Sequence, residues 1–154
     1  MKTFISYSTA HDQIIALRLQ TLAAVSGMTV YVPPATSRNV WNGVLVPEVQ
    51  KELRESDVIL AVILENPAPS AVAEMNFAIT TAKLLIPIVG PLVPLQYYAQ
   101  FRPHFVVNPI DPSETERQIV QFLAGKQQGE AVKAGLLLGT LAVALLLMLA
   151  SESK

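Results

Sequence analysis

The chain has 154 residues, a length typical of one folded domain with a short additional segment. Its formal net charge of −1 gives no overall attraction to nucleic acid, and the absence of cysteine excludes disulfides and thiolate metal sites. The two histidines, His11 and His104, lie far apart without the spacing of a zinc-binding helix, so we expect no metal site.

Strand and helix patterns alternate from the start of the chain. Residues 3–7 are β-branched, aromatic and largely apolar, which predicts a buried strand. A polar loop over 8–12 leads into a predicted helix over 13–26, which Gly27 is expected to cap. A second strand is predicted over 28–32, then a loop with two prolines over 33–43 and a helix over about 45–56.

The second half of the pattern is also regular at first. A continuous apolar run over 58–64 predicts a strand in a sheet covered on both faces. After a loop over 65–70, Ser70 is the expected N-cap of a helix that runs to about Lys83, and 84–89 is a fourth strand. Residues 91–104 show no clear pattern, 105–108 predict a short fifth strand, and a last helix is expected from Asp111, its N-cap, to Gly125.

This alternation predicts an α/β fold, a flavodoxin-like parallel sheet of about five strands with helices on both faces. Such sheets bind ligands beyond the carboxyl ends of their strands. Glu74 is the only acidic residue between Ser70 and Val89, and it lies near the start of a predicted helix at that edge. It is therefore a candidate site residue, although a first-turn acid favoured by the helix dipole has the same sequence pattern.

Residues 134–151 form an uncharged, apolar segment without a polar face. As a helix it spans roughly 27 Å, against about 30 Å for the hydrocarbon core of a bilayer. We expect a single transmembrane helix after a domain over 1–125 and a short polar linker over 126–133. A buried terminal helix of a soluble domain is the alternative, but such helices usually keep some amphipathic character.

The sequence around this segment bears on orientation and assembly. Lys126 and Lys133 precede the segment, which favours a cytoplasmic N-terminal domain. Gly135 and Gly139 form a GxxxG pattern that allows two membrane helices to approach closely, although the pattern also occurs by chance in such segments.

Five segments in order resemble the Toll/interleukin-1 receptor (TIR) domain, especially its bacterial members. They are "FISYSTAHD", "GMTVYVP", a glycine-ended loop, "ELRESDVILAVIL" and "SAVAEMNFAITTAKLLIPIV", and they cover about residues 3–90. Many TIR domains cleave the nicotinamide–ribose bond of NAD with a glutamate early in the third helix, and Glu74 matches that position. The resemblance implies an NAD glycohydrolase, or a producer of ADP-ribose or cyclic ADP-ribose signals, in bacterial antiviral defence. NAD is then the substrate, and no cofactor is implied.

The resemblance also implies roles for other residues. It places Tyr7 and Ser8 in a loop that holds nicotinamide and ribose, and it identifies residues 33–43 as the BB loop, through which TIR domains commonly assemble. Within that loop, Trp41 can stack on a ring and Arg38 can contact pyrophosphate. Each of these residues also has an ordinary role without a ligand. Tyr7 can be a core residue and Ser8 can form a turn, while Trp41 can anchor the loop and Arg38 can be a solvated cation. Ser70 stands where many catalytic members carry Trp, so either Trp41 supplies the aromatic wall or the pocket is remodelled around Ser70.

Two other functions fit the same sequence. One is a non-catalytic module that signals by TIR–TIR contact alone. The other is an enzyme similar to nucleoside deoxyribosyltransferases, a related α/β architecture that also uses a glutamate on a sugar. The apolar C-terminal segment and the spacing of "ELRESDVILAVIL" argue against the second.

Overall fold

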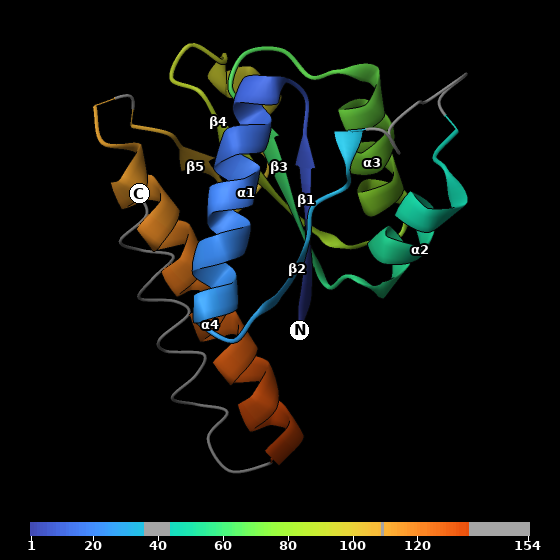
Figure 1. The fold of residues 1–154 in the computed structure, drawn as a ribbon, viewed down its shortest axis with the longest axis vertical. Helices are drawn as coiled ribbons and strands as arrows, with labels where there is room; N and C mark the ends of the chain where they lie inside the picture. Colours follow the sequence, from blue (N-terminus) through green and yellow to red (C-terminus); the bar gives the residue numbers. More distant parts are fainter. Residues whose placement is uncertain (36–43, 109, 136–154) are drawn as a thin grey trace.

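The computed structural model describes residues 1–35, 44–108 and 110–135 (Figure 1). Its five-stranded sheet has the order β2-β1-β3-β4-β5, and every neighbouring pair of strands is parallel. This is the strand order of flavodoxin-like sheets, so the predicted α/β sheet is confirmed. The strands are β1 Lys2–Tyr7, β2 Thr29–Tyr31, β3 Val58–Ile63, β4 Leu84–Val89 and β5 Phe105–Val106. The helices are α1 Ala10–Val25, α2 Pro47–Glu55, α3 Pro69–Thr80 and α4 Pro112–Gly135, with a 3₁₀ helix η2 at Leu95–Tyr97.

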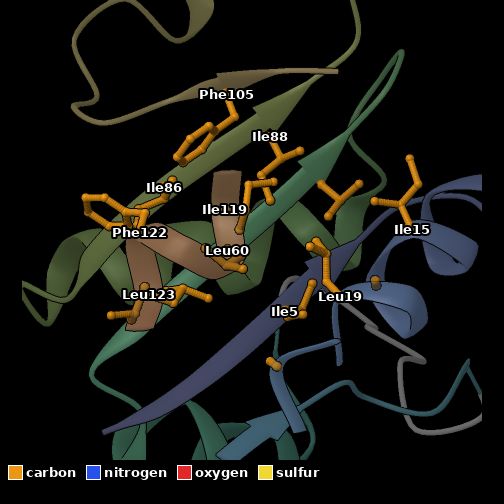
Figure 2. Packing of buried hydrophobic residues seen from close by; sticks show 14 of the residues in the cluster. Ile5, Ile15, Leu19, Leu60, Ile86, Ile88, Phe105, Ile119, Phe122 and Leu123 are labelled. Carbon is orange, nitrogen blue, oxygen red and sulfur yellow. The ribbon is translucent and has the colours of Figure 1, made fainter. Parts of the chain in front are cut away.

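Helices cover both faces of the sheet. On one face, α1 and α4 pack against alternate residues of the central strands, as Figure 2 shows. The aromatic rings of Phe105 and Phe122 meet there at a centroid distance of 6.2 Å. On the other face, α2 and α3 pack through Val49, Leu53 and Ala78 against Phe4 and its neighbours. Burial on both faces explains why β3 is a continuous apolar run.

The first helix begins earlier than expected. The sequence predicted a loop over 8–12, but α1 starts at Ala10 with Thr9 as its N-cap. Thr9 and Asp12 form a capping box, in which each side chain accepts a hydrogen bond from the other residue's backbone N–H. At its other end, Gly27 follows the helix with φ of +75°, as its predicted capping role requires.

The start of α3 corrects the prediction for Ser70. The N-cap is Ala68, which makes no side-chain capping bond, and Pro69 is the first helical residue. Proline suits this position because its fixed φ is helical and its missing N–H would be unpaired there. Ser70 is therefore the second residue of the helix, and the prediction that it caps α3 was wrong.

The predicted end of the last helix at Gly125 was also wrong. The helix α4 continues to Gly135, through the residues expected to form a polar linker. One glycine costs only about 1 kcal/mol inside a helix, and the lysine and glutamines that follow it favour helix. No described helix is long and apolar enough to cross a membrane, and most of the predicted span, 134–151, lies outside the described residues.

The connection from β4 to β5 leaves the sheet at a tightly packed glycine. The Gly90 N–H donates to the Ile63 carbonyl at 3.1 Å, and a Cβ at position 90 would lie 2.0 Å from the carbonyl oxygen of Leu64. No side chain fits there unless the backbone moves. Gly90 therefore sets the path of the connection to β5, in which η2 is the only described helix.

We expect Gly90→Ala to lower the free energy of unfolding by about 3 kcal/mol or more, because the methyl group overlaps backbone that cannot turn aside. Gly27→Ala is the matched control. Its Cβ would meet nothing within 4 Å, so only the cost of positive φ remains, about 1–2 kcal/mol. Urea unfolding of the detergent-solubilised chain, followed by circular dichroism, measures both. Equal losses would contradict the proposed role of Gly90.

Candidate functional site

The strand order defines one preferred location for a ligand. From β1 the chain moves to β2 on one side, and it then crosses to β3 on the other side of β1. The helices α1 and α3, which follow β1 and β3, consequently lie on opposite faces and leave a crevice beyond the ends of these two strands. Tyr7 ends β1 and Ile63 ends β3, so the site is expected between these residues.

Glu74 lies beside this crevice and is buried, with 1% of its surface exposed. Its Oε1 atom accepts a hydrogen bond from the hydroxyl of Ser6 at 2.6 Å, and Ser6, on β1, is also fully buried. A first-turn acid that only complements a helix dipole is normally solvated. Because α3 begins at Pro69, Glu74 also lies beyond the first turn, so its position and its burial both exclude that simple alternative.

Asp12 fixes the rim of the crevice. Its Oδ2 atom accepts the backbone N–H groups of Ser8 and Thr9, each at 3.1 Å, and its Oδ1 atom accepts the N–H of Leu64 at 3.3 Å. One buried carboxylate thus joins the loop after β1, the start of α1 and the end of β3. The sequence placed Asp12 in the predicted loop over 8–12, and its link to the end of β3 depends on the fold.

Ser8 links the same rim to α3. Its hydroxyl oxygen accepts the N–H of Ala68, the N-cap residue of α3, at 3.0 Å. The predicted site residue Ser8 is therefore near the start of the helix that carries Glu74. Because this hydroxyl can also donate a hydrogen bond, it can still contact a ligand while it holds the loop.

Tyr7 lies on the other face of the sheet. Strand alternation points Ser6 toward α3 and Tyr7 into the core under α1. The Tyr7 hydroxyl donates to the carbonyl of Pro33 at 2.7 Å and accepts from the Gln13 side-chain amide at 3.3 Å. Tyr7 therefore holds the start of the loop after β2, and its side chain is not brought together with Glu74.

The other predicted site residues are placed only in part. Ser70 is half-buried in the first turn of α3, one turn before Glu74. Arg38 and Trp41 lie outside the described residues, so their predicted contacts with pyrophosphate and an aromatic ring stay predictions.

Tyr31 is a neighbour of the site that sequence reasoning missed. It ends β2 and packs against Phe4, with ring centroids 5.6 Å apart. Burial raises the pKa of the Tyr31 phenol, and the carboxylates of Glu48, Glu52 and Glu74 act in the same direction. Tyr31 thus remains a neutral hydroxyl at physiological pH, close enough to respond to the charge of Glu74. Its position at the end of a strand beside β1 is the signal that could have identified it.

No model of a known protein family matches the chain, and no curated protein is similar to it. Among the described residues, no three histidine or carboxylate side chains lie close enough together to hold a metal ion.

The hydrogen bond between Ser6 and Glu74 predicts a measurable coupling. Ser6→Ala should lower the free energy of unfolding by about 1–3 kcal/mol, because a buried carboxylate loses a donor. The loss should be smaller in a Glu74→Gln background, since a neutral amide needs that donor less. Urea unfolding of the four chains gives the coupling energy, with Ser26→Ala as an exposed control expected within 0.5 kcal/mol. A coupling energy of zero would count against this bond.

Proposed function

We propose that the protein cleaves NAD at the bond between nicotinamide and ribose, with Glu74 as the catalytic carboxylate. The observation that carries this proposal is the buried position of Glu74 at the strand-order crevice, with its Oε1 held by Ser6. The matched position of Glu74 in the TIR pattern supports the same function. Activity of this kind makes the protein an NAD glycohydrolase or an ADP-ribosyl cyclase-type enzyme.

The chemistry requires a fixed negative charge more than an acid. When the bond from ribose C1′ to the nicotinamide nitrogen breaks, both electrons go to that nitrogen and neutral nicotinamide leaves. The ribose acquires oxocarbenium character, which a nearby carboxylate stabilises most strongly where water is excluded. Attack on C1′ by water gives ADP-ribose and a proton, whereas attack by a nitrogen of the adenine ring gives a cyclic product.

The first test is nicotinamide release from NAD by the full chain in lipid, with and without a lysate of phage-infected bacteria. We expect Glu74→Gln to reduce release at least 100-fold, about the effect of removing one preorganised electrostatic group. Glu114→Gln, an exposed change in the first turn of α4, should leave release unchanged.

Each alternative function predicts a different result. A folded wild-type chain that releases no nicotinamide under either condition would favour a TIR–TIR interaction module, with Glu74 in a structural role. Cleavage of deoxynucleosides instead of NAD would favour the nucleoside deoxyribosyltransferase-like enzyme.

We also propose that residues 134–151 anchor the protein in a membrane, with the N-terminal domain in the cytoplasm and activity in antiviral defence. The composition of that segment supports the anchor, and Lys126 and Lys133 support the orientation. Self-association through Gly135 and Gly139 would bring the domains together and raise their effective concentration.

The anchor predicts resistance to alkaline extraction. The wild-type chain should stay with the membrane pellet, whereas arginine at both Leu145 and Leu146 should release it, since each arginine opposes insertion by about 3 kcal/mol. Leu92→Arg, at an exposed position before η2, is the control and should stay in the pellet. In the same membranes, Gly139→Leu should lower the yield of cross-linked dimers. Release of the wild-type chain by alkali would contradict the anchor.

A further inference from the structure

A second cavity, of about 440 Å³, lies beside α3 under the segment that connects β4 to β5. Three alternate residues of β4, Leu85, Pro87 and Val89, line it from the sheet. Met75 lines it from α3, and residues 65–67, the loop after β3, line it at the carboxyl edge of the sheet. Its volume lies within the range of small-molecule sites.

The cavity follows from how β4 and β5 are connected. Crossovers between parallel strands usually carry a helix that covers the sheet, but the described turn here is the three-residue η2. The aromatic side chains of Tyr97, Tyr98 and Phe101 cover the sheet in its place and line the cavity from above. Since so short a turn cannot pack closely along β4, space remains beneath it.

Contacts at both ends hold this cover in place. At the start, Gly90 packs against the backbone of Leu64. At the end, Nδ1 of His104 lies 2.8 Å from the carbonyl oxygen of Phe101 in a hydrogen bond, and the His104 ring meets Tyr98 edge-on at 4.9 Å. The residues that cover the cavity are therefore held in place by contacts at both ends of the segment.

The lining selects ligands by charge. Among the described residues that line the cavity, Glu65 is the only carboxylate, and none is a lysine, arginine or histidine. Within the described part of the chain, the Glu65 side chain has neither an ion pair nor a hydrogen bond. An anionic ligand would find no countercharge among these described residues, whereas a cation would find a free carboxylate and aromatic rings.

We propose that this cavity binds a small aromatic compound that carries an organic ammonium group. The apolar floor and Met75 would contact the ring system, and Glu65 with Tyr97 would contact the ammonium group at the mouth. Tyr97 suits that place because its side chain is part of the lining while 65% of the residue remains exposed.

This site adjoins the one proposed for NAD at Ile63, which ends β3 and also lines the cavity, but the two use different side chains of α3. Successive residues of a helix point about 100° apart, so α3 presents Glu74 to β1 and Met75 to the cavity. The pyrophosphate of NAD, an anion, would also find no cationic partner among the described lining residues. The inference does not depend on NAD cleavage, and it can fail or hold independently of that proposal.

The methionines provide a local probe of binding. The chain has four methionines, of which Met75 lines the cavity while Met28 is buried in the core on the opposite face of the sheet. In the full chain in lipid nanodiscs, labelled with ¹³C-methyl methionine, 1-naphthylmethylammonium should shift the Met75 signal saturably and leave the Met28 signal unchanged. The variants Met75→Leu and Met28→Leu assign the two signals.

Matched probes and variants test the ligand class. The anion 1-naphthoate has the same ring system, and we expect it to bind at least ten-fold more weakly. Glu65→Gln should weaken binding of the ammonium probe about three- to ten-fold, with Glu114→Gln as a control without effect. Tyr97→Ala should weaken it similarly, whereas Leu95→Ala, in the same turn and 60% exposed, should not, because Leu95 does not line the cavity.

Three results would overturn the proposal. One is a Met75 signal that does not shift, or that shifts in proportion to probe without saturation, as partition into lipid would cause. Another is equal affinity for the ammonium probe and 1-naphthoate. The third is unchanged affinity in both Glu65→Gln and Tyr97→Ala chains with native circular dichroism spectra.

Discussion

The Asp12 carboxylate is the interaction on which the candidate site depends. The loop after β1, the N-cap of α1 and the end of β3 meet at the strand-order crevice, and each directs a backbone N–H to this one side chain. Hydrogen bonds to a charged group contribute about 1.5–3 kcal/mol each, more than those between neutral groups. Without Asp12, the N–H groups of Ser8, Thr9 and Leu64 would lose this acceptor, and the rim would lose the geometry that also lets Ser8 accept the N–H of Ala68.

One face of the sheet carries most of the apolar core, and the other carries the candidate sites. The face under α1 and α4 holds the larger apolar cluster, and it includes Tyr7, whose hydroxyl fixes the start of the loop after β2. The face under α2 and α3 holds Ser6, Glu74, Tyr31 and the cavity beside Met75. Both faces are positioned by the same strands, because β1 contributes Tyr7 to one and Ser6 to the other. A change at the end of β1 therefore acts on both.

Most of the sheet could be predicted from the sequence, because apolar runs mark β3 and β4, and β-branched and aromatic residues mark β1. The ends of helices were harder, since they depend on local competition. Pro69 starts α3 before Ser70 can cap it, and Gly125 is too weak a break to end α4. In the site, Glu74 could be predicted as a candidate, but its contact with Ser6 joins residues 68 positions apart and required the strand register. The cavity beside Met75 could not be predicted, because it is the space that the connection after β4 leaves open above the sheet.

The identity of the side chain at position 74 bears on whether the crevice is catalytic. A structural partner for the Ser6 hydroxyl could equally be a glutamine, whose carbonyl accepts the same hydrogen bond without the cost of burying a charge. Burying a carboxylate costs more than burying a glutamine, and only the carboxylate can stabilise a transition state that carries positive charge. Tyr31, which burial keeps neutral, adds no second negative charge next to Glu74. A buried carboxylate beside an uncharged phenol is suited to stabilise a cation that forms only during reaction, which is what cleavage of a nicotinamide–ribose bond requires.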